Sequence, residues 1–176
     1  MKRLVLILIF GLTIVPLMTF AQGEPGWNKK SLGANFEMSL PMGDFKLIAG
    51  NGYGGNLRFQ LGADNRSVFT ATAGYLVWGK KDLGANTSVQ PKAFNFFLGG
   101  KYYLADGFYG SLEGGFYFFS YTYEGTVLGT QGDTGRFMLP IGIGYQKSGF
   151  ELGVRYMLLA TNVNSFSFTL GYNFMM

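Results

Sequence analysis

The chain has 176 residues, about the length of one domain, and a net charge of +4. It contains no cysteine, which excludes a disulfide framework and a thiolate metal site, and no histidine, which removes the commonest general base. Hydrophobic residues make up 48% and charged residues only 14%, yet past the N-terminus no apolar run is long enough for a membrane-spanning helix. The small net charge also argues against a nucleic-acid partner.

The N-terminus has the three parts of a signal peptide. Lys2 and Arg3 provide positive charge, residues 4–18 form a short apolar core, and residues 19–21 (Thr-Phe-Ala) form a small-x-small cleavage site. We therefore expect cleavage and export. An uncleaved anchor is the alternative, but the core is short for a span and Pro16 interrupts it. The expected organisation is a signal peptide at 1–21, a short polar N-terminal lead-in at 22–30 and a single barrel domain at 31–176.

From residue 31 onward apolar residues recur with a period of two, which is typical of strands and not of helices. The last segment shows this best, because one face carries only large apolar residues, at Phe166, Phe168, Leu170, Tyr172 and Phe174. The same pattern predicts strands at 31–40, 53–62, 67–78, 93–104, 108–123, 136–145, 149–160 and 165–174. Pro140 cannot donate a ladder hydrogen bond, so it predicts a bulge in the sixth strand or a later start.

The connections between these strands alternate in length. Tight turns are expected at 63–66, 105–107 and 146–148, and long polar loops at 41–52, 79–92 and 124–135, with 161–164 a short exception. Short periplasmic turns and longer outer loops are typical of outer-membrane barrels. We therefore predict an all-β, eight-stranded antiparallel up-and-down transmembrane β-barrel in the outer membrane of a Gram-negative cell, surrounded by outer-membrane lipid.

The second face of the strands consists mostly of Gly, Ser, Thr and Asn, which suits a narrow lumen better than a surface in water. Three carboxylates and three cations on this face balance, and they predict a lumen ion-pair network of Glu37, Arg58, Lys101, Glu113, Glu151 and Arg155. Large residues are expected to plug the remaining space, namely Phe97, Tyr103, Tyr109, Tyr117 and Met138. The alternative is that some of these charges lie in water near strand ends.

Aromatic residues near the strand ends predict interfacial girdles on the outer face of the barrel. The candidates are Tyr53, Trp78, Tyr102, Tyr121, Tyr123, Tyr145, Tyr172 and Phe174. Tyrosine and tryptophan also anchor ordinary cores, so a position in a core is the alternative for each of these residues.

Several segments resemble the small outer-membrane β-barrel domain common in Bacteroidota. They are Gly33-Ala34-Asn35-Phe36, Leu40-Pro41-Met42-Gly43-Asp44-Phe45, residues 139–145 (Leu-Pro-Ile-Gly-Ile-Gly-Tyr) and residues 150–156 (Phe-Glu-Leu-Gly-Val-Arg-Tyr). In general architecture residues 31–174 also resemble OmpA/OmpX-type barrels. The resemblance implies insertion by the barrel-assembly machinery, and residues 171–174 resemble the C-terminal signal that this machinery reads. Met175 and Met176 follow that signal here, which departs from the pattern.

Enzyme activity is not expected. The lipid A palmitoyltransferases and deacylases, which this chain resembles in size, rely on a histidine. The register does place Lys101 near Ser111, but nothing in the sequence would depress the lysine pKa as a Ser–Lys mechanism requires. No cofactor and no metal site are predicted. Eight strands also enclose too little space for a porin-type channel, so a narrow channel is only a lesser alternative.

Surface interaction or a structural role is the leading functional prediction, because loops on a rigid barrel are where binding usually resides. The candidate loop contacts to an extracellular ligand are Lys80, Lys81, Asp82, Lys92, Glu124 and Asp133. Two alternatives stay open. The loops could be solvated caps without a ligand, or the chain could be a soluble secreted or periplasmic lipocalin-like barrel whose apolar face points inward around a ligand.

Overall fold

The computed structural model describes residues 29–84, 86–125, 129–132, 135–158 and 163–176. The expected signal peptide and most of the polar lead-in lie outside the described residues, as does Asp133. Within the described part, no helix combines the length and the apolarity needed to cross a membrane.

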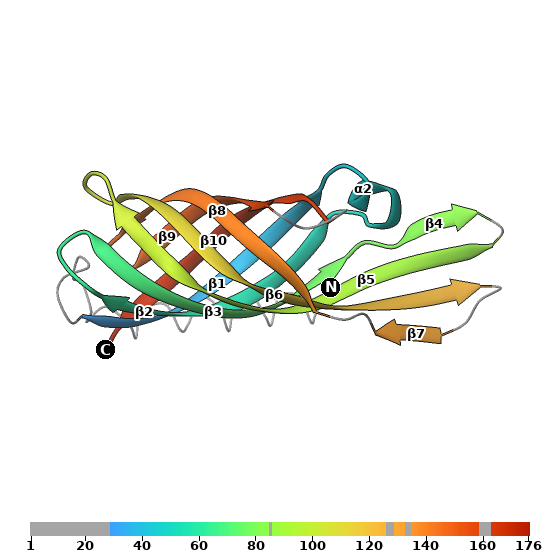
Figure 1. Cartoon of the computed structure of the whole chain (residues 1–176), viewed down its shortest axis with the longest axis horizontal. Helices are drawn as coiled ribbons and strands as arrows, with labels where there is room; N and C mark the ends of the chain where they lie inside the picture. The colour runs from blue at the N-terminus through green and yellow to red at the C-terminus, as the bar shows by residue number, and fades with distance from the viewer. Residues whose placement is uncertain (1–28, 85, 126–128, 133–134, 159–162) are drawn as a thin grey trace, which may run out of the picture.

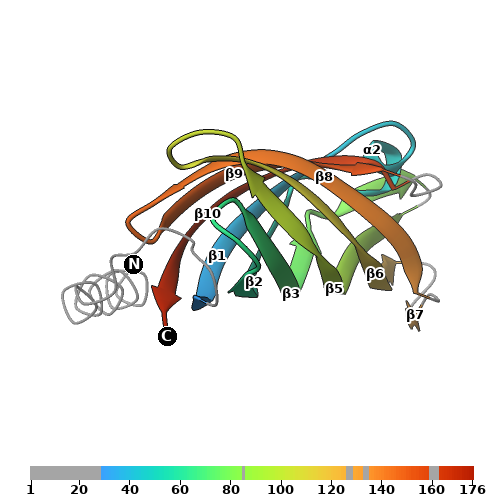
Figure 2. The ribbon, with the colours of Figure 1, turned by 60° about the vertical axis from the view of Figure 1, so that its left-hand side comes forward.

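Eight long strands form a closed antiparallel barrel (Figure 1, Figure 2). They are β1 (Lys30–Pro41), β2 (Gly52–Gly62), β3 (Ser67–Trp78), β5 (Thr87–Tyr103), β6 (Phe108–Gly125), β8 (Arg136–Lys147), β9 (Phe150–Leu158) and β10 (Ser165–Met175). The ring closes where the first strand pairs with the last, from Ser31 opposite Met175 to Pro41 opposite Ser165. All eight predicted strands are present, and the three predicted tight turns connect them at one end of the barrel.

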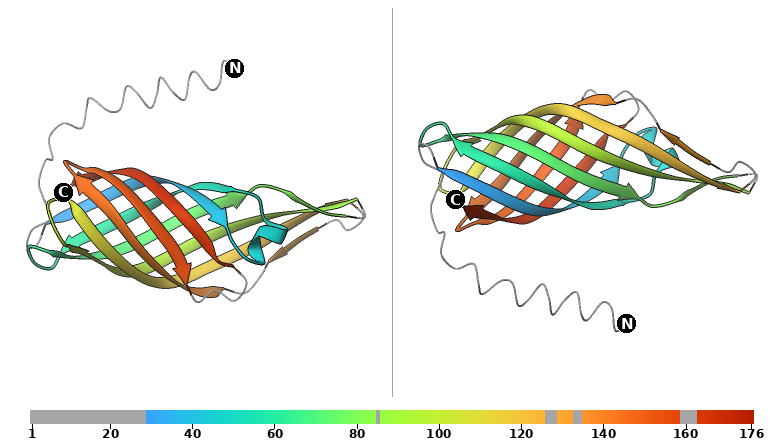
Figure 3. Two further views of the ribbon diagram at one scale, coloured as in Figure 1. Left: turned by 90° about the horizontal axis from the view of Figure 1, so that it is seen from above. Right: turned by 90° about the horizontal axis from the view of Figure 1, so that it is seen from below.

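Two of the predicted long loops are largely strand, so that part of the prediction is wrong. The strands β5 and β6 continue beyond the barrel and pair as far as Thr87 opposite Gly125. Two short strands, β4 (Lys81–Gly84) and β7 (Gly129–Gly132), pair along their outer edges. Together β4, residues 87–92, residues 120–125 and β7 form an antiparallel sheet, here called the projecting sheet. It extends from the barrel end opposite the C-terminus (Figure 1, Figure 3).

The third long loop contains a short helix, α2 (Phe45–Ile48), at the same end of the barrel as the projecting sheet. Gly43 begins this turn in the left-handed region, with a φ of 55°, which a residue with a side chain rarely adopts. The side chain of Phe45 is fully buried, so the helix is attached to the barrel interior by an apolar contact.

The prediction for Pro140 is also wrong, because β8 has neither a bulge nor a later start. The register between β6 and β8 is the same on both sides of the proline, with Leu112 opposite Ile141 and Gly115 opposite Met138. Between these two residue pairs, β8 makes no direct pairs with β6. On its other side Pro140 pairs with Met157 of β9. The strand therefore tolerates the proline by omitting ladder bonds on one side only.

Candidate functional site

The six charges that the sequence places in the lumen meet there as one alternating chain, here called the ion-pair chain. Its contacts run Lys101–Glu151 (2.8 Å), Glu151–Arg58 (2.5 Å), Arg58–Glu113 (3.8 Å), Glu113–Arg155 (2.9 Å) and Arg155–Glu37 (2.6 Å). Each of these side chains is at most 5% exposed. The alternative in which some of the six lie in water near strand ends does not fit this burial.

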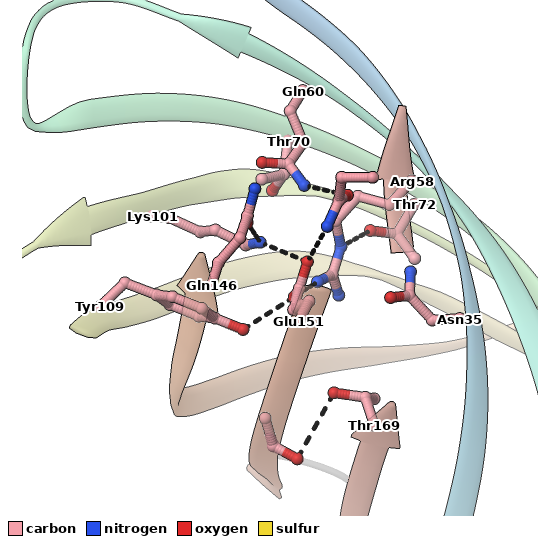
Figure 4. Close-up of polar contacts among 12 residues, drawn as sticks. Asn35, Arg58, Gln60, Thr70, Thr72, Lys101, Tyr109, Gln146, Glu151 and Thr169 are labelled. Carbon is pink, nitrogen blue, oxygen red and sulfur yellow. Dashed lines mark hydrogen bonds and ion pairs between the residues drawn. The ribbon is translucent and has the colours of Figure 1, made fainter. Parts of the chain in front are cut away.

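Uncharged neighbours support the carboxylates of the ion-pair chain, as Figure 4 shows for Glu151. Glu151 lies between Lys101 and Arg58 and also accepts a 2.7 Å hydrogen bond from the hydroxyl of Tyr109. The hydroxyls of Thr70 and Thr72 both donate to Glu113 at 3.1 Å. These contacts matter because a buried charge is tolerable only when it is paired and hydrogen-bonded.

Between the ion-pair chain and the projecting sheet, the lumen is filled by aromatic and apolar side chains, here called the aromatic cap. Phe45 of α2 packs edge-on against Trp78, with ring centroids 5.3 Å apart, and Phe119 lies 6.0 Å from the same Phe45. The buried members of the cap include Trp78, Phe97, Tyr117, Phe119, Tyr121, Met138 and Met157. At the other end Tyr103 and Tyr109 form a second buried group. All five residues predicted to plug the lumen are thus buried inside it.

The girdle prediction is wrong for three residues. Trp78 is 1% and Tyr121 9% exposed, both inside the aromatic cap, and Tyr123 is half-buried against it. The indole N–H of Trp78 donates to Ser39 at 3.3 Å, so its polar atom finds a partner inside the lumen. The remaining candidates are on the outer face and are half or partly exposed. They are Tyr53, Tyr102, Tyr145, Tyr172 and Phe174.

The outer wall of the barrel is apolar. On β10 the outward positions are those predicted from the period of two, and β5 presents Phe94, Phe96, Leu98 and Tyr102 in the same way. Among the described residues of the barrel strands, charges occur on this face only toward the two ends, at Lys30 and Lys147 on one side and at Lys92 and Glu124 on the other.

The structure does not gather the predicted loop contacts into one site. Lys80 and Glu124 form an exposed ion pair at 2.6 Å, and Asp82 accepts the backbone N–H of Gly84 at 2.9 Å. Lys92 belongs to β5, not to a loop, and its side chain is on the outer face just above the apolar wall. Lys81 begins β4 and stands opposite Val89.

Sequence reasoning missed a cleft at the projecting end, here called the mouth cleft. It has a volume of about 340 Å³ and is lined by Ile48, Leu83, Val89, Tyr121, Tyr123, Gly132 and Arg136. The guanidinium carbon of Arg136 lies 5.7 Å from the ring centroid of Phe119, which stacks in turn on Tyr121. The sequence pattern predicts a girdle position for these two tyrosines and does not indicate Arg136.

The Ser–Lys pair considered from the sequence can be placed in the structure. Lys101 is opposite Ser111 as the register predicts, but its amine contacts Glu151 at 2.8 Å and donates to Gln146 at 2.9 Å, so it is not placed as a base for that hydroxyl. Within the described residues no three His, Cys, Asp or Glu side chains are close enough together to hold a metal ion.

Solved structures match the chain along most of its length, whereas no protein family and no curated protein matches its sequence. Ail, the attachment invasion locus protein of Yersinia pestis, matches in its complex with the heparin analogue sucrose octasulfate, with a TM-score of 0.64, 11% identity, and coverage of 85% of this chain and 99% of Ail. The fold is that of a small outer-membrane β-barrel. A second Ail structure gives a TM-score of 0.63 at 13% identity, covering 85% and 99% of the two chains. Neisserial surface protein A gives 0.50 at 11% identity, covering 82% of this chain and 96% of that one.

Proposed function

We propose that this chain is an outer-membrane barrel that acts as a rigid scaffold for surface interaction through its projecting sheet. The observation that carries the proposal is the distribution of polarity, with charges inside the barrel and apolar side chains outside. A lipocalin-like barrel needs the opposite distribution, because its apolar face surrounds the ligand and its outer face is in water.

The height of the apolar wall supports a membrane location. On β5 the outward apolar residues run from Phe94 to Leu104, which directly follows the strand. These ten steps span about 33 Å along the strand at about 3.3 Å per residue. A strand tilt of about 40° reduces this to about 25 Å of height, the apolar band expected of a transmembrane barrel.

The filled lumen supports a scaffold over a channel. The ion-pair chain crosses the interior, and the aromatic cap fills the space beneath the projecting sheet. Eight strands leave barely enough room for side chains even without such filling. The short turns are then periplasmic and the projecting sheet extracellular, as in barrels of this size.

The projecting sheet supports a role in surface interaction. It places four strands beyond the wall on a rigid base, and β4 and β7 are its two outermost strands. An exposed edge strand is a template for pairing with another chain, and regular structure costs less entropy to immobilise than a loop does. Ail is by name an attachment protein and binds a heparin analogue in the matched structure. We extend attachment at a host or neighbouring surface to this chain as a proposal.

Shortening the two hairpins tests this proposal. Replacing residues 82–88 by Asn-Gly joins the paired residues Lys81 and Val89 through a two-residue turn, and replacing 122–130 in the same way joins Tyr121 and Gln131. We expect cells that carry the shortened barrel to lose attachment to a glycan- or protein-coated surface, while gel mobility still shifts on boiling. A control in which 82–88 is replaced by an equally long Gly-Ser segment separates loss of length from loss of sequence. Unchanged attachment by the shortened barrel would remove the proposal.

A further inference from the structure

In the described part of the barrel, three neighbouring polar atoms of the lumen have no hydrogen-bond partner. They are Arg155 Nε on β9, Ser167 Oγ on β10 and Glu37 Oε1 on β1. Ser167 is opposite Arg155 on one side, and on the other side Glu37 is opposite Thr169, two residues farther along β10. The three side chains therefore meet on the inner wall beside the seam where β1 and β10 close the ring, a place here called the seam site. A fourth such atom, Asn35 Oδ1, is farther along β1 on the side away from Ser167.

The three atoms of the seam site are shielded from bulk water. Arg155 is 4%, Glu37 1% and Ser167 0% exposed. The two charged groups contact each other through other atoms, because Arg155 donates from Nη2 to Glu37 Oε2 at 2.6 Å and from Nη1 to Glu113 at 2.9 Å. One N–H of the guanidinium and one oxygen of the same Glu37 carboxylate remain. A buried polar atom without a hydrogen bond is costly, most of all on a charged group, so a bound molecule that both donates and accepts is favoured here.

We propose that the seam site binds one water molecule, which accepts from Arg155 Nε–H and donates to Glu37 Oε1 and Ser167 Oγ. Three hydrogen bonds are about what a buried water makes in a protein. A cation held by Glu37 would lie against the guanidinium, and an anion held by Arg155 would lie against the carboxylate, so an uncharged ligand fits and an ion does not. Ser167 and its neighbour Ser39 on β1 are both small, which suits an occupant of the size of water.

The bound water adds a second link to the Arg155–Glu37 pair and so supports the end of the ion-pair chain. Ser39, opposite Ser167, accepts the indole N–H of Trp78 at 3.3 Å, so the seam site is where the ion-pair chain meets the aromatic cap. This place belongs to the barrel interior and not to the projecting sheet. Water binding here is therefore independent of attachment through that sheet.

The direct test is a crystal structure of the full mature chain at a resolution that shows ordered water. We expect one water peak within about 2.6–3.2 Å of Arg155 Nε, Glu37 Oε1 and Ser167 Oγ. Arg58 Nε donates directly to the hydroxyl of Thr72 at 3.0 Å, so it is the internal control and should have no water beside it. No peak at the seam site would overturn the proposal, and so would a peak that refines as an ion or a direct protein partner for Arg155 Nε.

NMR of the isotope-labelled chain in detergent micelles tests the same water in solution. We expect a cross-peak between Arg155 Nε–H and water that persists in Ser167→Ala, because the two charged partners still hold the water. The hydroxyl that could relay the signal is gone in this variant, so loss of the cross-peak there would overturn the proposal.

A larger side chain should displace the water. Ser167→Val places two methyl groups at the seam site and should abolish the cross-peak of Arg155 Nε–H. Ser165→Val is the matched control, a buried serine two residues away on the same face of β10, and should leave the cross-peak unchanged. A cross-peak that survives in Ser167→Val would contradict the assigned position of the water. If Ser167→Val does not fold, Ser167→Ala and the crystal structure decide.

Discussion

Removing the charge of Arg155 should cost a large part of the stability of the barrel. Arg155 donates to Glu37 at 2.6 Å and to Glu113 at 2.9 Å, and both contacts are buried. Each hydrogen bond to a charged group contributes about 1.5–3 kcal/mol, so the two together contribute about 3–6 kcal/mol. Breaking a buried ion pair costs about 3–5 kcal/mol by a separate measure, which agrees. We expect Arg155→Met to lower the free energy of unfolding by about 3–5 kcal/mol.

The cost arises mainly because Glu37 loses its cation. Glu113 keeps Arg58 at 3.8 Å, whereas Glu37 then keeps the amide of Asn56 at 3.0 Å. The double variant Arg155→Met, Glu37→Gln removes that uncompensated charge. It should therefore cost less than the sum of the two single variants, by about 0.5–3 kcal/mol.

The assay is equilibrium unfolding in guanidinium in the presence of lipid vesicles, followed by tryptophan fluorescence. Arg66→Met, at an exposed arginine in a turn, is the control and should change the free energy by no more than about 0.5 kcal/mol. The reasoning is refuted if Arg155→Met behaves like this control, or if the two single variants add without coupling.

Three further predictions concern the wall, the cap and one turn. Leu98→Arg, near the middle of the apolar band, should destabilise the barrel in lipid by about 2–4 kcal/mol, and Leu104→Arg at its edge by about 0–1 kcal/mol; equal costs in the same unfolding assay would contradict the proposed depth. Phe45→Ala should cost about 3–5 kcal/mol and expose the rings beneath α2, seen as a changed emission of Trp78; an unchanged spectrum would mean that α2 does not close the cap. The backbone N–H groups of Arg66 and Ser67 lower the pKa of Asp64 below its usual 3.8, so the ionised side chain stabilises this turn above that pH and its contribution is lost as the pH falls through the lowered pKa. Carbon-detected NMR titration should give a midpoint below 3.8, and a midpoint equal to that of the unfolded chain would show that the two bonds do not form in solution.

The strands and the ion-pair chain could be predicted because apolar and polar side chains alternate along each strand with a period of two. Glu37, Arg58 and Glu151 are on the small-residue face of their strands, and in a barrel of this width all residues of that face must converge. The same rule placed Tyr109 and Phe97 correctly inside.

The projecting sheet could not be predicted, because only a small part of it has a buried face. Val89 and Pro91 are buried in residues 79–92, which is too short an alternation of apolar and polar side chains to indicate a strand, and the glycine and threonine content of 79–92 and 124–135 is typical of loops. The contact of Phe45 with Trp78 is set by tertiary packing over a loop and leaves no local signal either.

The inward position of Trp78 could have been found. It has the same parity in β3 as Thr70 and Thr72, which are on the lumen face, so the strand period already pointed the indole inward. The girdle prediction for Trp78 depends on its position near the strand end, which is a weaker indicator than its parity in the strand. Residue type is the weaker guide here, because tyrosine and tryptophan are equally suited to a core.

The central claim is that apolar side chains face lipid and charges face the lumen. Because the sequence has no cysteine, Leu98→Cys provides a unique attachment point for a spin label on the outer wall. In lipid vesicles the account predicts that the label collides with dissolved oxygen, which concentrates in hydrocarbon, far more often than with a water-soluble nickel chelate. A label that meets the nickel chelate more often, on a chain that stays in solution without lipid or detergent, would contradict the account.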